Sequence, residues 1–225
     1  MEQVWVAGER EEVVASLKVL GTLLRTKPSD VSLSAFFEML EQEKLREFWP
    51  VGGKGDEGDK GDVGNGGQLE GGLDEVQGKL LSHARDKELD LLWQAMFVGP
   101  NHLTAPPWGS VYLDHEQVVF GDSCVELGFF LKSLGLVLDT GMHEPEDHMG
   151  LMCWYVAALL EANRDEELTV LLGEHVLPWA YRYTGLLGET AVHPFFEGMA
   201  ALVEVSFKGL QKRYDVMPLE KRIYF

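Results

Sequence analysis

Four titratable side chains stand within five residues, directly before the most apolar run of the chain. They belong to the stretch Glu144-Pro145-Glu146-Asp147-His148. The apolar run at 149–160 leaves almost no polar face, which is typical of a central core helix. Proline suits the first helical position, so Pro145 predicts a helix start, with Glu146 and Asp147 in the first turn. We therefore expect carboxylates and an imidazole to be held at the rim of the core by a rigid helix.

Helix capping and metal binding are two chemistries open to this cluster. Capping needs no further assumption, because acidic residues stabilise the start of a helix. A zinc site of the HExxH type needs histidines four residues apart on one face. Here His143 and His148 are five apart, with Pro145 between them. One helical turn cannot aim both rings at one ion, so we predict no metal ligand.

Catalysis is a third chemistry, and the sequence disfavours it. Ser110 or Ser123 would have to form a triad with His148 and Asp147. Adjacent positions on a helix diverge by about 100°, which prevents the required hydrogen bond between aspartate and histidine. The chain also has no GxxxxGK[ST] loop, GxSxG elbow or CxxC pair. We predict no catalytic residue and no cofactor, and a metal-dependent enzyme is the least favoured alternative.

Further motifs accompany this cluster on both sides. They are LWQAMFVGP at 92–100, APPWGSVYLD at 105–114, VFGDS at 119–123, EHVLPW at 174–179 and HPFF at 193–196. Together with the 144–148 stretch, they make the chain resemble the DmsD/TorD family of redox-enzyme maturation chaperones. The resemblance is strongest from about 92 to 202 and weak before 50. The PPWGS and FGDS pieces bring it closest to the dimethyl sulfoxide reductase branch.

The resemblance implies a function. It implies a cytoplasmic chaperone, not an enzyme, that binds the twin-arginine signal peptide of a molybdopterin oxidoreductase of the DMSO or TMAO reductase type. The chaperone would hold this leader during cofactor insertion and assembly, before export by the Tat pathway. The family implicates the PPWGS loop and the Glu-Pro-x-Asp-His turn together in leader binding. The positions that carry over are Trp93, Phe97, Trp108, Gly109, Ser110, Gly121, Pro145, Asp147 and His148.

We expect the leader to bind as a helix in a groove. Its apolar stretch would lie against Trp93, Met96, Phe97 and Trp108. Asp147, with Glu146 or Asp114, would pair with the two arginines, because a carboxylate can meet a guanidinium in a bidentate manner. His148 would orient Asp147 or donate to a leader carbonyl.

Composition agrees with a partner of this kind. Thirty-seven acidic against nineteen basic residues give a net charge of −18, which disfavours nucleic acid and anionic membranes and favours a basic ligand. Cys124 and Cys153 lie in apolar patterns, which is typical of unpaired thiols in a reducing compartment. The N-terminus has no signal-peptide pattern, and the run at 149–160 is too short to span a bilayer. We expect a cytoplasmic monomer without stable membrane insertion, and a helix-swapped dimer stays open.

The hydrophobic pattern predicts an all-α, single-domain bundle over residues 1–225. Helices are predicted at 9–25, 33–40, 43–48, 73–97 with a break near 83–87, 124–134, 145–160, 165–176, 179–187 and 194–214. Ser32 and either Asp122 or Ser123 are the expected caps, and Gly135 is an expected stop. A glycine at every third position from 52 to 67 predicts a flexible Gly/Asp-rich insertion at 52–72. The long segment 98–121 predicts a functional loop, with a small hairpin between 111–113 and 118–120.

Two departures from the family pattern concern the groove. Arg25 stands where relatives often have an aromatic residue, and Asn101 replaces a tryptophan after the Gly-Pro pair. We therefore expect a groove that is less apolar on one side.

The main alternative function is that of an assembly factor for a redox enzyme that is not exported, as in the nitrate reductase branch. Components of the Tat translocase are a further expected partner.

Overall fold

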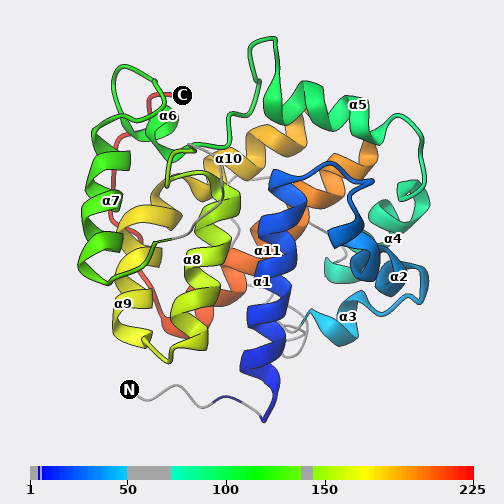
Figure 1. Cartoon of the computed structure of the whole chain (residues 1–225), viewed down its shortest axis with the longest axis horizontal. Helices are drawn as coiled ribbons and strands as arrows, with labels where there is room; N and C mark the ends of the chain where they lie inside the picture. The colour runs from blue at the N-terminus through cyan, green and yellow to red at the C-terminus, as the bar shows by residue number, and fades with distance from the viewer. Residues whose placement is uncertain (1–4, 6, 50–71, 138–143) are drawn as a thin grey trace.

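The computed structural model describes residues 5, 7–49, 72–137 and 144–225, and the regular secondary structure in these ranges is helical (Figure 1). The elements are α1 (Glu9–Arg25), η1 (Val31–Leu33), α2 (Ser34–Glu41), α3 (Leu45–Phe48), α4 (Gly72–His83), α5 (Leu89–Trp93), η2 (Gln94–Val98), α6 (Gly109–Leu113), α7 (Asp122–Ser133), α8 (Met149–Glu161), α9 (Asp165–Val170), η3 (Leu171–Val176), α10 (Leu177–Glu189) and α11 (Pro194–Tyr214). The predicted all-α fold is confirmed. The single domain stays a prediction, and the predicted insertion lies outside the described residues except for Gly72.

Helix α8 lies at the centre and packs along α1 (Figure 1). It is buried on nearly every side, as its apolar sequence predicts. Two glycines let the backbones approach closely. A Cβ added at Gly21 would lie 2.6 Å from the carbonyl oxygen of Gly150, and a Cβ added at Gly150 would lie 2.8 Å from that of Gly21. The contact brings the last turn of α1 against the first turn of α8.

Helix α11 lies behind α1 and packs mainly against α4 and α10 (Figure 1). Its inner face carries Phe195, Phe196 and Phe207, all fully buried. The bounds of α1 and α11 are those predicted from the apolar spacing, because each helix buries one continuous stripe. The predicted break near 83–87 is also confirmed, since α4 ends at His83.

Local predictions had mixed outcomes. Gly135, with φ of 69°, follows α7 as expected. At the first predicted cap, Asp30 instead accepts a hydrogen bond from the N–H of Ser32. The predicted hairpin is wrong, because 111–113 belongs to α6 and 118–120 forms no strand. Both segments resemble strands locally, but 111–113 complete the short helix α6 and 118–120 lie in the turn before α7.

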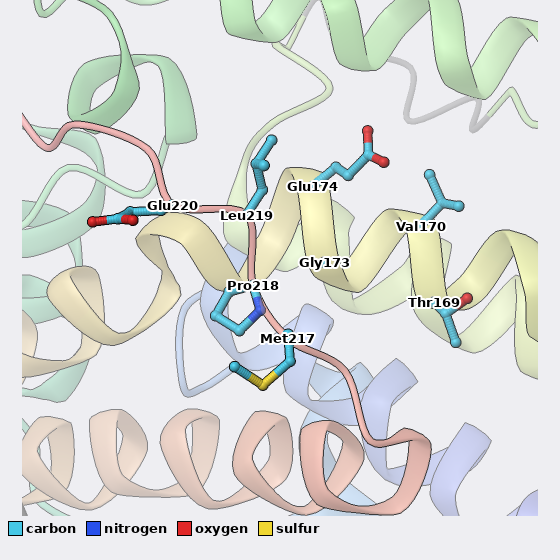
Figure 2. Close-up of a pocket in the computed structure, with 8 residues that line it drawn as sticks. All are labelled: Thr169, Val170, Gly173, Glu174, Met217, Pro218, Leu219 and Glu220. Atoms are coloured by element: carbon cyan, nitrogen blue, oxygen red, sulfur yellow. The ribbon is translucent and has the colours of Figure 1, made fainter.

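The C-terminal tail after α11 crosses η3 and ends at α6. The N–H of Leu219 donates to the carbonyl of Gly173 (2.8 Å), and that of Tyr224 donates to the carbonyl of Tyr112 (2.9 Å). Figure 2 shows the tail passing over η3, where the two segments border a hollow of about 390 Å³. The tail therefore braces α6, which begins at Gly109 within the PPWGS motif.

Candidate functional site

The 144–148 segment precedes α8 and is not its first turn. Helix α8 begins at Met149, and His148 is its N-cap, with φ of −63° and ψ of 129°. The Nδ1 atom of His148 accepts a hydrogen bond from the N–H of Gly150 at 2.9 Å. The prediction that Pro145 opens the helix is therefore wrong, and so is the placement of Glu146 and Asp147 in its first turn. A cap needs an extended backbone and a side-chain acceptor, and the histidine supplies both.

The PPWGS loop and the 144–148 segment lie side by side. Trp108 and His148 form an antiparallel bridge, and the N–H of Met149 donates to the carbonyl of Pro107 at 2.7 Å. The ring of Trp108 meets the ring of His148 edge-on, with centroids 5.8 Å apart. The tryptophan is half-buried. Two motifs that are far apart in the sequence thus form one structural unit.

Asp147 ties this unit to α6. Its backbone carbonyl accepts from the N–H of Gly109 (3.1 Å), and its Oδ2 accepts from the N–H of Ser110 (2.6 Å). The residue is only 3% exposed, and its Oδ1 has no hydrogen-bond partner among the described residues. Burial raises the pKa of Asp147, although the hydrogen bonds from Ser110 oppose the shift. In this conformation the carboxylate organises the loop from inside.

The glycine of the PPWGS loop is required by packing. A Cβ added at Gly109 would lie 2.8 Å from the Nε1 atom of Trp179. This indole nitrogen already donates to the carbonyl of His175, so its position is fixed. Gly109 therefore lets the first turn of α6 rest directly on α10.

His148 is held neutral. Burial lowers its pKa to about 3, and the charge of Arg25 contributes further. Since Nδ1 accepts from the α8 backbone, the ring proton is on Nε2, which faces Glu144 Oε1 at 3.6 Å. His148 thus serves as a cap and a packing surface for Trp108.

Arg25 has a structural partner that sequence reasoning missed. Its Nε donates to Oε2 of Glu144 at 2.9 Å, and Nη2 contacts the same oxygen. The guanidinium also lies over the ring of Trp154, 4.7 Å from the centroid. The arginine side chain is 6% exposed and that of Glu144 is 17% exposed. A lone arginine in the last turn of a helix that packs on the core could have indicated a buried ion pair. Its partner, Glu144, could not be found this way because it lies 119 residues away in the sequence.

Asp114 and Gly121 form a second local unit. Both carboxylate oxygens of Asp114 lie 3.2 Å from the N–H of Ser123, whose hydroxyl also donates to Oδ2 at 2.8 Å. A Cβ added at Gly121 would lie 2.1 Å from this carboxylate. The predicted cap at Asp122 or Ser123 is wrong, because both lie inside α7 and Gly121 is the N-cap. The acceptor comes instead from Asp114 in the preceding turn.

Trp93, Met96 and Phe97 lie on the α5–η2 segment and are each less than 10% exposed. The rings of Trp93 and Phe97 stack with centroids 5.8 Å apart, and Phe97 also contacts Phe196 of α11. These aromatic contacts point toward the core between α5 and α11, whereas Trp108 contacts His148. The predicted apolar residues thus form two groups.

Glu146 completes the set of predicted site residues. It is half-buried, and its Oε2 accepts a weak hydrogen bond from the Cys124 thiol at 3.7 Å. Pro145 beside it is buried. His143, which entered the predicted metal alternative, lies outside the described residues. The hydroxyl of Ser123 donates to Asp114, so it is not directed at His148 as a triad would need.

The sequence of this chain is similar to those of a known protein family and of several named chaperones. A model of the family described as nitrate reductase delta subunit matches residues 67–184. The chain is 32% identical over 195 residues to a probable Tat proofreading chaperone DmsD of Haemophilus influenzae, covering 87% of this chain and 86% of that protein. The chain belongs to the DmsD/TorD family. Among its other relatives are the Tat proofreading chaperone DmsD of Salmonella typhimurium, 29% identical over 96% of this chain and 97% of the relative, and the chaperone protein TorD of Shewanella pealeana, 23% identical over 72% and 73%.

Membership confirms the family inferred from the PPWGS and EPEDH motifs and the prediction of a chaperone, since these relatives are named chaperones. Among the described residues of this DmsD/TorD-type chain, no helix combines the length and hydropathy needed to cross a bilayer.

Proposed function

We propose that this DmsD/TorD-type chain binds the twin-arginine leader of a molybdopterin oxidoreductase of the DMSO or TMAO reductase type. The chaperone holds the leader during cofactor insertion and assembly, before Tat export. One observation carries the proposal: Trp108 and His148 form a bridge that joins the two leader-binding motifs of the family. The names of the DmsD relatives, which are Tat proofreading chaperones, support it.

Within this site we assign the arginine contact to Glu146. Asp147 is 3% exposed and accepts from Ser110, while the carboxylate of Asp114 is engaged by Ser123. Glu146 is half-buried, and its carboxylate accepts a weak hydrogen bond from the Cys124 thiol. Its carboxylate therefore gains most from a guanidinium partner. Asp147 and His148 act as positioning residues that fix the loop on either side.

The apolar contact centres on Trp108. Its ring is half-buried, and the bridge to His148 fixes its backbone, so little conformational entropy is lost when a peptide packs against it. The Nε1 atom of Trp108 is buried without a hydrogen-bond partner among the described residues. We assign Trp93, Met96 and Phe97 to the inner wall of the groove, because they are already buried.

Isothermal titration with candidate leader peptides tests the proposal. A peptide with Arg-Arg should bind, and the same peptide with Lys-Lys should bind more weakly. Glu146→Gln should lower affinity about tenfold, the loss of one charge-assisted pair of about 1.4 kcal/mol. Glu38→Gln, which removes an exposed carboxylate on α2, is the charge-matched control and should change nothing. Equal affinity of the Glu146 and Glu38 variants would remove Glu146 from the site.

Trp108→Ala should abolish leader binding while leaving the helical circular dichroism intact, since the ring is half-buried. Asp147→Asn should weaken binding with the helical signal preserved, because it alters the acceptor for Ser110. Unchanged leader affinity in both variants would show that the peptide binds elsewhere.

A second candidate function is an assembly factor for a redox enzyme that is not exported. The description of the matching family as nitrate reductase delta subunit favours it. Such a client would present a segment without paired arginines. Binding that is equal for the Arg-Arg and Lys-Lys peptides would therefore favour this alternative. A cytoplasmic location, a monomeric state and contact with the Tat translocase remain parts of the proposal.

A further inference from the structure

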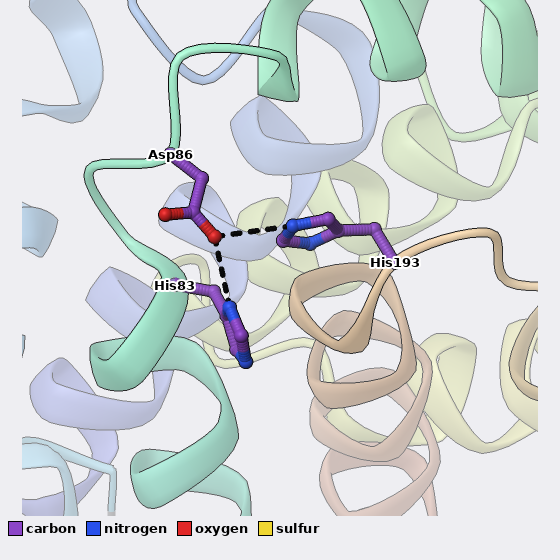
Figure 3. Close-up of side chains that lie close together, drawn as sticks. All are labelled: His83, Asp86 and His193. Carbon is purple, nitrogen blue, oxygen red and sulfur yellow. Dashed lines mark hydrogen bonds and ion pairs between the residues drawn. The ribbon is translucent and has the colours of Figure 1, made fainter.

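Two histidines and an aspartate meet where α4, the following turn and the start of α11 come together (Figure 3). Oδ2 of Asp86 lies 2.8 Å from Nδ1 of His83 and 3.1 Å from Nε2 of His193. The three atoms all lie within 4.8 Å of one another. We propose that His83, Asp86 and His193 bind one divalent transition-metal ion of the zinc class. This site is separate from leader binding and does not depend on it.

The ligand types and distances suit such an ion. Zinc binds imidazole nitrogen and carboxylate oxygen at about 2.0–2.2 Å, which places two ligand atoms of a tetrahedral site about 3.3 Å apart. The two separations from Asp86 Oδ2, 2.8 Å and 3.1 Å, therefore need to open by only a few tenths of an ångström, and the two imidazole nitrogens lie within 4.8 Å of each other. A fourth ligand is within reach, because Oε1 of Glu88 lies 4.0 Å from Nε2 of His193. Two nitrogens in the set favour zinc over magnesium, which prefers oxygen ligands.

Exposure and charge also fit a site that an ion can enter. The side chains of His83 and Asp86 are 34% and 41% exposed, whereas that of His193 is 9% exposed. An ion from solvent could thus reach the buried imidazole of His193 by way of the exposed side chains of His83 and Asp86. The carboxylate of Asp86 faces both imidazole rings, so it supplies negative charge and a ligand oxygen between the two nitrogens.

The helix cap at His193 sets the proton position in the metal-free protein. Nδ1 of His193 accepts a long hydrogen bond of 3.3 Å from the N–H of Phe195, so Nε2 carries the proton and donates to Asp86. On metal binding the proton of His193 moves from Nε2 to Nδ1, the proton of His83 moves from Nδ1 to Nε2, and the metal takes the two freed lone pairs. The N–H of Phe195 then loses this acceptor. A network of hydrogen bonds without a metal is the competing description, and the experiment below separates the two.

Binding an ion here would brace the turn that leads into α5. His83 ends α4, and His193 precedes α11, whose residue Phe196 contacts Phe97. A metal bound only by the folded chain stabilises it by RT ln(1 + c/Kd), where c is the free metal concentration, so the midpoint of thermal unfolding rises with the logarithm of c once c exceeds Kd. Zinc should therefore stabilise the α4–α5 junction against α11.

The test uses the full chain without a polyhistidine tag, after chelator treatment. Equilibrium dialysis against zinc should give one ion per chain, and zinc but not magnesium should raise the melting temperature. His83→Ala and Asp86→Asn should each weaken zinc binding more than about tenfold. His115→Ala removes a histidine that is 81% exposed outside the cluster, and it should bind zinc like the parent.

His193→Asn guards against a folding artefact, since asparagine retains a capping acceptor for α11 but removes the imidazole. It should fold and bind zinc as weakly as His83→Ala. The proposal fails if the unmodified chain holds no more zinc than the dialysis buffer. It also fails if the variants at His83, Asp86 and His193 bind zinc as tightly as His115→Ala. It also fails if magnesium stabilises the chain as much as zinc.

Discussion

The ion pair between Arg25 and Glu144 predicts a large and specific loss of stability on mutation. It fixes the 144–148 segment against α1, and its side chains are 6% and 17% exposed. Glu144→Gln would leave the arginine buried without its counter-charge. Breaking one partner of a buried pair costs roughly 3–5 kcal/mol, and the partial exposure of Glu144 favours the lower end, about 3 kcal/mol. For a chain of this size, that lowers the melting temperature by about 6–12 °C.

A matched control lies between α1 and the far end of α8. Lys18 of α1 pairs with Glu161 at the end of α8 at 2.8 Å, but the two side chains are 50% and 63% exposed. Glu161→Gln removes the same charge by the same chemistry and should cost less than about 1 kcal/mol, because exposed pairs are screened by solvent. The comparison isolates burial as the variable.

Chemical denaturation monitored by circular dichroism measures both variants, with unchanged m-values as the condition for comparing free energies. The double variant Arg25→Met/Glu144→Gln should recover part of the loss, since it removes the uncompensated charge as well. A free energy of unfolding for Glu144→Gln equal to that of Glu161→Gln would refute the argument. So would a double variant that is less stable than Glu144→Gln alone.

Three further predictions follow from the same region. Because burial places the pKa of His148 at about 3, below its unfolded value of 6.5, the neutral ring stabilises the fold above pH 6.5. This contribution is lost as the pH falls, by about 3 kcal/mol near pH 4. His148→Asn, which keeps a capping acceptor, should flatten the acid limb of the stability profile, and an identical limb would contradict this. Gly109→Ala should cost about 1–3 kcal/mol in urea unfolding, because its Cβ would lie 2.8 Å from Trp179, whereas Gly185→Ala, with open space at its Cβ, should be neutral or stabilising. Burial raises the pKa of Cys124 to about 12, so this thiol should react with Ellman's reagent in the native chain far more slowly than after denaturation, and equal rates would show that it is accessible.

The helical elements could be predicted from sequence because their signal is local. Apolar residues three and four positions apart mark one face of a helix, and this pattern predicts α1 and α11 with their observed bounds. The short segments were harder to predict. The 111–113 residues look like part of a strand, but α6 forms there because Gly109 allows close packing on Trp179.

The chemistry of the 144–148 segment could be predicted only in part. Its residue types predict a site, and the bridge between Trp108 and His148 brings the two family motifs together. The role of each side chain depends on burial, which no local pattern reports. Asp147 is enclosed and bonded to Ser110, and His148 caps α8. Glu146 keeps an accessible carboxylate.

The sequence by itself therefore determined the helical class, the family and the positions of the PPWGS and Glu-Pro-x-Asp-His motifs. Tertiary structure alone decided which charged groups meet. Arg25 finds Glu144, and His83 and Asp86 find His193, across stretches of chain with no shared local pattern. The reason is physical: helix propensity and amphipathicity act over a few residues, whereas ion pairs and ligand clusters depend on how whole helices pack.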